Sequence, residues 1–124
     1  GTSTAYFWGN DINSSRANYN WSGSYNDGND SKQTVDVGQF APNSWGFFDM
    51  HGNVWEWTHD WYQPVYPTGN PVVDPTGPLS GTARILRGGS WGPGGNFVRS
   101  SLRFPYPPNN KNFAIGFRVS LQLE

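Results

Sequence analysis

Alternating apolar and polar positions mark four short segments of this chain as strands. They are Val35–Phe40, Val54–Thr58, Arg84–Arg87 and Phe113–Leu123. In the second segment the alternation puts Trp55 and Trp57 on one face, which predicts a strand that is buried on one side. The segments between the strands are rich in glycine and proline, above all 63–82 and 92–112, and predict long surface loops. A long helix is hard to place anywhere.

The composition supports one folded domain that covers the whole chain. Only 35% of the 124 residues are hydrophobic, but 17% are aromatic, with seven Trp, six Tyr and eight Phe. A few large rings can bury as much apolar surface as many aliphatic side chains. The high content of Gly, Pro, Ser and Asn would also suit a disordered chain, but disordered chains are poor in aromatic residues. We therefore expect a folded domain.

Charge and cysteine content exclude several classes of function. Eight basic and nine acidic residues give a net charge of −1, so the chain has no electrostatic footprint for nucleic acid. No apolar run approaches the roughly 20 residues that a membrane span needs. Cysteine is absent, which excludes disulfides and thiol chemistry within this chain. A cytoplasmic and an exported location both stay open.

Three dense boxes carry the most specific information in the sequence. The first, Gly46–Trp57, packs two acids, two glycine-centred bends and two tryptophans into a run that follows no regular period. The second is Arg84–Trp91, and the third is Ile115–Val119. In this order the boxes resemble the formylglycine-generating enzyme family, also called the sulfatase-modifying-factor domain. The resemblance implies a C-type-lectin-like α+β fold, loop-rich with little regular secondary structure and with short antiparallel strands.

The stretch after the second box lacks the residues that the family uses for catalysis. Family enzymes oxidise a substrate cysteine to formylglycine and hold copper with two of their own cysteines, just after the Gly-Gly-Ser box. Here that stretch, Ser90–Val98, has no cysteine, and soft Cu(I) prefers thiolate ligands. We therefore expect no copper and no oxidase activity from this chain by itself. The chain also resembles only the C-terminal half of a longer unit.

The acids of the first box are the best candidates for metal ligands. Calcium binds six to eight hard oxygens from carboxylates and carbonyls. Asp49 and Glu56 supply two carboxylates, and Gly52 and Val54 supply two carbonyls around a glycine bend. The resemblance implies a structural calcium ion at these four positions. The alternative is that both carboxylates accept backbone N–H bonds and hold the loop without metal.

A second calcium ion is implied more loosely by the resemblance. The family uses an Asn with the carbonyl that follows it, and an acidic residue about a dozen positions on. Asn18, Tyr19 and Asp30 fit this pattern at a shorter spacing, and Asn29 could equally be the residue concerned. The alternative, a turn-capping Asn and a solvated Asp, is the stronger interpretation here.

We expect a ligand surface between the second and third boxes. Trp55 and Ser90 match residues that line the family's substrate groove, and Asn96, Arg99 and Arg103 lie on the long loop beside them. An indole face, a hydroxyl and guanidinium groups can bind a peptide or a sugar ring. The alternative is that Trp55 is a core residue and that the arginines tie loop carbonyls together. A structural role is expected for Arg118, and core positions for Trp57, Trp61, Trp91 and Phe117.

Three functions are compatible with these features. The first is a non-catalytic, calcium-stabilised binding domain whose 91–112 loop binds a peptide, protein or glycan ligand. The second is a diversified receptor of a diversity-generating retroelement, because some variable proteins of that kind share this fold. The third is a sulfatase-modifying oxidase whose catalytic residues lie outside this chain. Exposed strand edges would favour pairing between copies, so a homodimer is also expected.

Overall fold

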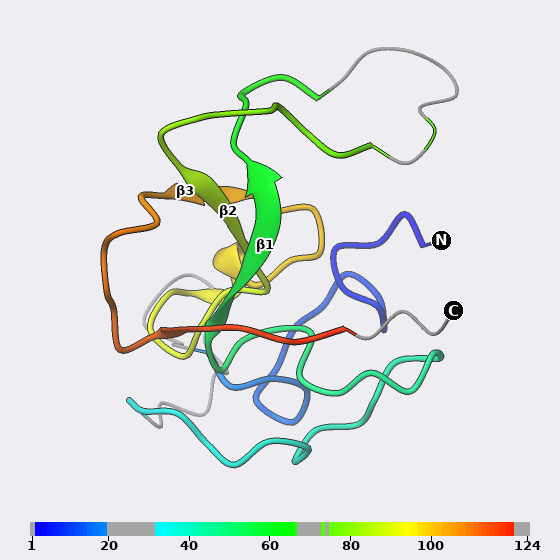
Figure 1. Ribbon diagram of the computed structural model, residues 1–124. Coiled ribbons are helices and arrows are strands. Elements are labelled where there is room, and N and C mark those ends of the chain that lie inside the picture. The colour runs from blue at the N-terminus through cyan, green and yellow to red at the C-terminus, as the bar shows by residue number, and fades with distance from the viewer. Residues whose placement is uncertain (1, 20–31, 67–72, 74, 121–124) are drawn as a thin grey trace.

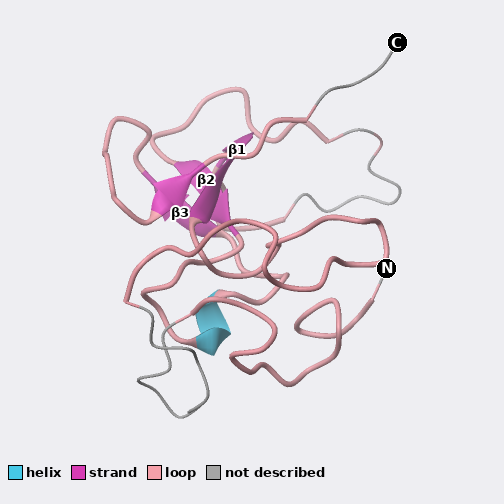
Figure 2. Cartoon of the chain, turned by 90° about the horizontal axis from the view of Figure 1, so that it is seen from below, coloured by secondary structure: helices cyan, strands magenta, loops and turns pink. Residues whose placement is uncertain are grey.

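The computed structural model describes residues 2–19, 32–66, 73 and 75–120. Most of this part is loop, and it contains no α-helix (Figures 1 and 2). Within these residues there is therefore no helix that is long and apolar enough to cross a membrane. The regular elements are the strands β1 (Trp55–Trp61), β2 (Arg84–Arg87), β3 (Phe104–Tyr106) and β4 (Ile115–Gly116), and the short 3-10 helix η1 (Gly95–Phe97). The predicted loop-rich fold with short strands is confirmed.

The four strands form one sheet in the order β3-β2-β1-β4. β2 pairs antiparallel with both β1 and β3, and Leu86 lies opposite both Trp57 and Phe104. β4 pairs with β1 in parallel, so the sheet is mixed where antiparallel strands alone were expected. The parallel pairing is possible because β4 reaches β1 through the long connection after β3 and not through a hairpin (Figure 1).

The alternating pattern located the two central strands well and the last strand poorly. Arg84–Arg87 is β2 with the expected bounds. The strand expected at Val54–Thr58 is β1, which begins one residue later and continues to Trp61. The strand expected at Phe113–Leu123 shortens to β4 within the described residues. Period-2 patterning thus identifies strands that are covered by neighbours, but it overestimates the length of an edge strand.

The strand expected at residues 35–40 is wrong. The backbone turns at Gly38, whose φ of +79° lies in the left-handed region, and Val37 is exposed. The N–H of Val35 donates to Oδ1 of Asn53 at 3.0 Å, and its carbonyl accepts a hydrogen bond from Nδ2 of Asn53 at 3.2 Å. A side chain therefore satisfies the backbone groups that a neighbouring strand would otherwise pair with.

Asn53 ties loops from distant parts of the sequence to the turn before β1. Its N–H donates to the carbonyl of Asn18 at 2.8 Å, and its carbonyl accepts the N–H of Trp91 at 3.0 Å. Its amide oxygen also accepts from the amide nitrogen of Asn18 at 3.2 Å. Asn53 is buried with a φ of +65°, a left-handed conformation that asparagine adopts more readily than most residues. These hydrogen bonds hold the loops around Asn18, Val35 and Trp91 in place without strand pairing.

The main hydrophobic cluster lies among the loops and not on the sheet. It comprises Tyr6, Ile12, Ala17, Tyr19 and Val98. The hydroxyl of Tyr6 donates to the carbonyl of Gly95 at 3.0 Å, which joins the N-terminal loops to η1. Figure 2 shows η1 among these loops, apart from the strands. The domain therefore has two regions, a sheet half with its own buried Ile85 and Leu86, and a loop half.

The aromatic residues expected in the core differ in their burial. Those that are only partly buried include Trp57, Trp61 and Trp91. Phe117 is 76% exposed, so its expected core position is wrong. It follows the edge strand β4, and it lines an open cavity beside Asp49 instead of the sheet interior. Trp55 is buried and stacks on Phe104, with ring centroids 5.1 Å apart.

Candidate functional site

The four residues considered as calcium ligands lie around one cavity. Asp49, Gly52, Val54 and Glu56 all line it, and its volume is about 380 Å³. The bend between them depends on positive φ angles at Asp49 (+54°) and Gly52 (+81°). A Cβ at position 52 would lie 2.2 Å from the carbonyl oxygen of Asn18, so glycine is required there. The bend brings residues from both sides of the turn to one cavity.

Both carboxylates at this cavity already bind protein groups. Oδ2 of Asp49 accepts the N–H of Gly38 at 2.6 Å. Glu56 binds Arg118 through both oxygens, because Nη2 donates to Oε1 at 2.7 Å and Nε donates to Oε2 at 3.0 Å. Nη2 of Arg118 also donates to the carbonyl of Asp49 at 3.3 Å. The hydrogen bonds and charge of Glu56 raise the pKa of Arg118, which stays cationic and ties the third box to the first.

The oxygen atoms around this cavity fit the chemistry of calcium. They are hard donors on irregular backbone, of the two kinds that calcium takes. The carbonyl oxygens of Gly52 and Val54 accept no hydrogen bond from any described residue. Within the described residues no three His, Cys, Asp or Glu side chains form a metal-binding group, so an ion here would depend on those carbonyls. Arg118 would share Glu56 with the ion.

The residues considered for a second calcium ion lie only partly within the described structure. Asp30 and Asn29 fall outside the described residues. Asn18 and Tyr19 are fully buried in the loop half. The amide nitrogen of Asn18 donates to the carbonyl of Gln33 at 3.0 Å. In the described residues, therefore, Asn18 connects loops through hydrogen bonds.

A second cavity, which we name the aromatic cavity, lies over one face of the sheet. Its volume is about 330 Å³, and its walls include Trp55, Ser90, Trp91, Phe104, Asn112 and Phe113. Trp55 from β1 stacks on Phe104 from β3, and the rings of Trp91 and Phe113 lie 5.7 Å apart. None of the described residues that line it carries a charged side chain. The lining residues of this cavity thus combine aromatic rings with hydroxyl and amide groups.

The sequence pointed to two of these residues and missed the others. Trp55 and Ser90 were proposed together and lie together here. Phe104 and Tyr106 were missed, although alternation around Pro105 puts both rings on one face of β3. The sequence pattern places Phe113 only at the start of a strand. Proline inside a short strand hides the alternating pattern, because proline normally argues against a strand.

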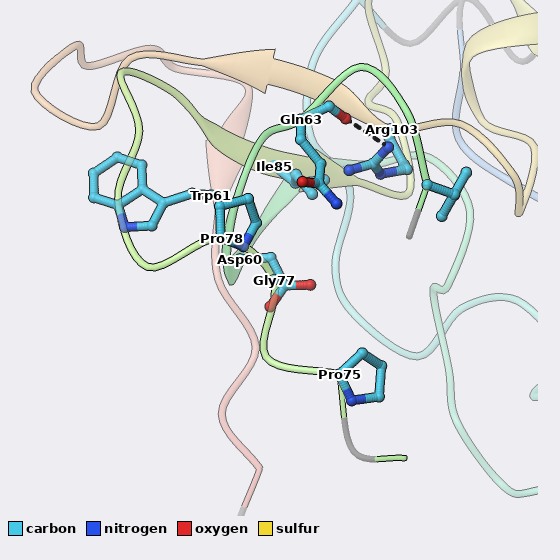
Figure 3. A pocket seen from close by; sticks show the side chains of 9 residues that line it. Asp60, Trp61, Gln63, Pro75, Gly77, Pro78, Ile85 and Arg103 are labelled. Carbon is cyan, nitrogen blue, oxygen red and sulfur yellow. Dashed lines mark hydrogen bonds between the residues drawn. The ribbon is translucent and has the colours of Figure 1, made fainter. Parts of the chain in front are cut away.

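The remaining residues of the expected ligand surface lie elsewhere. Asn96 is exposed on η1, and its carbonyl accepts Nη1 of Arg99 at 2.6 Å. Arg103 lines a third cavity, which we name the Arg103 cavity, beside Gln63 and Tyr66 (Figure 3). The long loop therefore sends its polar side chains to different places and does not form one continuous surface with Trp55.

His51 is buried in the loop half. Its Nδ1 lies 2.6 Å from the carbonyl oxygen of Val98, and the rings of Tyr6, Phe7 and Trp8 surround the imidazole. Burial lowers the pKa of His51, although the hydrogen bond to Val98 opposes that shift. His59, by contrast, is exposed. The neutral imidazole serves packing.

The sequence profile of the sulfatase-modifying factor enzyme 1-like domain, FGE-sulfatase, matches residues 1–123. The chain belongs to this family. This FGE-sulfatase domain is 40% identical over 90 residues to a formylglycine-generating enzyme of Streptomyces coelicolor, and 34% identical over 122 residues to that of Mus musculus. The alignments cover 70% and 91% of this chain, but only 29% and 32% of the relatives, so the chain spans about a third of their length.

Solved structures similar to this FGE-sulfatase domain agree with its fold. Treponema denticola variable protein 1 superposes with a TM-score of 0.68 at 35% identity, over 81% of this chain and 34% of that one. PvdO from Pseudomonas aeruginosa superposes with a TM-score of 0.64 at 34% identity, over 84% of this chain and 38% of that one. The family and the formylglycine-generating-enzyme-like fold that the sequence predicted are therefore confirmed.

Proposed function

We propose that this FGE-sulfatase domain is a non-catalytic, calcium-stabilised binding domain. Its ligand would be a peptide, protein or glycan that places an uncharged group in the aromatic cavity, between the sheet and the segment 91–112. The observation that carries the proposal is this cavity, in a chain that has no thiolate for copper. Cu(I) sites in proteins favour soft sulfur ligands, so this chain by itself is a poor copper protein.

The walls of the aromatic cavity suit a ring or an apolar side chain with a few polar groups. Ligand pockets generally combine aromatic walls with a small number of placed hydrogen-bonding groups. Here the hydroxyl of Ser90 and the amide of Asn112 are such groups. A charged ligand group would lose its hydration without gaining a charged partner from these walls. The cavity therefore favours a sugar ring or an apolar peptide side chain.

The sheet supplies a rigid floor for this cavity. Trp55 and Phe104 come from strands on either side of β2, and Leu86 of β2 also lines the cavity. Backbone ladders fix the strands, so the stacked rings do not have to be ordered when a ligand binds. A site on regular elements loses less conformational entropy on binding than a site on loops alone.

Calcium would stabilise the turn that leads into β1, the strand that carries Trp55. The carboxylates of Asp49 and Glu56 and the carbonyls of Gly52 and Val54 would hold it. The ion would supply a positive charge that offsets the two carboxylates and fixes the bend. Trp55 follows Val54 directly, so the same turn sets the position of the indole.

Binding assays on a matched pair of phenylalanine variants test the proposal. Phe113 is 80% exposed and lines the aromatic cavity, so Phe113→Ala should remove ligand contact without unfolding the domain. Phe97 is 45% exposed on η1 and is not among the residues that line the cavity, which makes Phe97→Ala the control. Glycan and peptide arrays would identify a ligand, and calorimetry would compare the variants. We expect Phe113→Ala to weaken binding about tenfold or more; equal affinities would overturn the proposal.

A diversified receptor is a second candidate, favoured by the similarity to Treponema denticola variable protein 1. In that case the segment between the second and third boxes would differ between copies of the gene while the boxes stay constant. Sequencing the gene and its neighbourhood in several isolates tests this, because a nearby reverse transcriptase and template repeat are required. An invariant segment without those genes would reject it.

A sulfatase-modifying oxidase is the third candidate, and the identity with formylglycine-generating enzymes favours it. Its catalytic residues would lie outside this chain, because no cysteine occurs here. Copper-dependent oxygen consumption with a cysteine-containing peptide, measured on the full-length gene product, would support this candidate. An inactive full-length product would dispose of it.

A further inference from the structure

The Arg103 cavity lies at the end of β1, away from Trp55 and Ser90. Its volume is about 240 Å³. The end of β1 and the residues after it supply Asp60, Trp61 and Gln63, and Tyr66 and Pro78 come from the loop toward β2. Arg103, just before β3, completes the wall (Figure 3). Unlike the aromatic cavity, this one has charged groups of both signs in its walls.

Arg103 is held in place with donors to spare. One of its nitrogens, Nη1, donates to the carbonyl of Gln63 at 3.1 Å. The guanidinium carbon lies 4.4 Å from the ring centre of Tyr66 and 5.3 Å from that of Tyr62. A guanidinium has five N–H donors, so the bond to Gln63 leaves others for a ligand. A planar guanidinium fixed in this way is suited to bind a carboxylate through two hydrogen bonds.

Asp60 presents the opposite charge to the same cavity. Its carboxylate receives no hydrogen bond from any residue that the structure describes. Among the described residues, an ion pair within 4.0 Å joins Arg118 to Glu56, and none joins the Asp60 carboxylate to Arg103. A Cβ at Gly77 would lie 3.4 Å from Cγ of Asp60, so the loop covers this carboxylate closely. A carboxylate in this position can accept hydrogen bonds from an ammonium group.

The rest of the wall is apolar. It comprises the rings of Trp61, Tyr66, Pro75 and Pro78 and the side chain of Ile85. Figure 3 shows the Arg103 guanidinium bonded to the backbone carbonyl of Gln63, with Pro78 and the Asp60 carboxylate below them in the view. Burying an apolar group against such walls contributes roughly 25 cal/mol per Å². A ligand for this cavity therefore needs an anionic group, a cationic group and an apolar body.

We propose that the Arg103 cavity binds a free α-amino acid with an apolar side chain. Arg103 binds its carboxylate, Asp60 binds its ammonium group, and the apolar side chain packs against Pro78 and Ile85. This site is distinct from the aromatic cavity in position and in charge. The proposal does not depend on what the aromatic cavity binds.

Calorimetric titration with L-leucine and two blocked forms tests the three requirements. N-acetyl-L-leucine keeps the carboxylate and loses the cation, and L-leucinamide keeps the cation and loses the carboxylate. We expect L-leucine to bind and each blocked form to bind about tenfold more weakly or worse, because each loses a charge-assisted pair. Equal binding of a blocked form, or no binding of L-leucine at millimolar concentration, would overturn the proposal.

Substitutions locate the site within the molecule. Asp60→Asn should weaken L-leucine binding about tenfold without unfolding the chain, since no described residue bonds to that carboxylate. Arg103→Gln should do the same, with its fold checked by circular dichroism because of its bond to Gln63. Arg99→Gln on the same loop and Phe113→Ala in the aromatic cavity are the controls and should leave binding unchanged. Loss of binding in either control, or undiminished binding in Asp60→Asn, would refute the assignment.

Discussion

The sheet half and the loop half of this domain keep their shape by different means. In the sheet half, backbone ladders join β1, β2 and β3, so side chains such as Trp55 and Phe104 are available to line a cavity. In the loop half, hydrogen bonds of side-chain amides, above all that of Asn53, hold the loops together in place of strand pairing. The difference implies that substitutions in the loop half change the architecture, whereas substitutions on the sheet face change a surface.

The largest effect is expected for Gly52→Ala, at the turn between the two halves. The new methyl group would lie 2.2 Å from the carbonyl oxygen of Asn18, and the φ of +81° disfavours any L side chain. We expect a loss of about 4 kcal/mol or more in the free energy of unfolding, measured by urea titration.

Gly46→Ala is the matched control, because Gly46 has a φ of +83° but nothing within 4 Å of a Cβ. It should cost only the backbone strain, about 1 to 2 kcal/mol. If both variants lose the same amount, contact with Asn18 is not what restricts position 52.

A smaller effect is expected for Asn53→Ala, which removes the amide that takes the place of a strand at Val35. The groups left behind in the buried loops lose their partners, and we expect a loss of about 2 to 4 kcal/mol by the same titration. Asn109→Ala, at an exposed turn position, should change stability by no more than about 0.5 kcal/mol. A loss for Asn53→Ala as small as this would show that the loops are held by other contacts.

Calcium should stabilise the junction of the two halves by a similar or smaller amount. An ion at a concentration one hundred times its dissociation constant stabilises the folded state by about 2.7 kcal/mol. We expect EDTA to lower the melting temperature, and we expect Asp49→Asn to abolish the difference between calcium and EDTA. Asp36→Asn, at an exposed position outside the cavity, should preserve it. Identical melting of the wild-type protein with and without calcium would reject the metal site.

The smallest effect is expected from pH, through His51 in the loop half. Its pKa in the folded state is lowered by burial, so the unfolded chain binds a proton first as the pH falls below 6.5. The stabilising contribution is complete above that pH and is lost as the pH decreases toward the folded-state pKa. Urea titrations between about pH 7.5 and 5.5 should show a slope that His51→Gln reduces and His59→Gln, at an exposed site, leaves unchanged. A steeper slope in His51→Gln would contradict this.

The sequence was a good guide to the sheet half because burial on a strand has a period of two. Arg84–Arg87 was found with its observed bounds, and the tryptophan pair of β1 was placed correctly. The loop half was harder, because its geometry comes from side-chain bonds between positions far apart in sequence. Nothing local to residues 35–40 shows that Asn53 binds the backbone N–H and carbonyl of Val35, so an alternating pattern there suggested a strand.

The candidate sites could be predicted from the sequence to different degrees. Asp49 and Glu56 lie within one short box, so their meeting around one cavity follows from a local bend. Ser90 and Arg103 both lie between β2 and β3 in the sequence. In the fold, however, Ser90 lines the aromatic cavity and Arg103 lines the Arg103 cavity. The division of the expected ligand surface into separate cavities is therefore a property of the tertiary fold, which residue types alone do not encode.

The parallel pairing of β4 with β1 has a consequence for how this domain folds. The ion pair beside it joins Glu56 to Arg118 across 62 residues, so this edge of the sheet closes only after a long stretch of chain has been synthesised. Contacts between residues so distant in sequence slow the folding rate, because the entropy of loop closure is lost before the contact forms. Until β4 arrives, one edge of β1 is an unpaired template on which a nascent chain can aggregate.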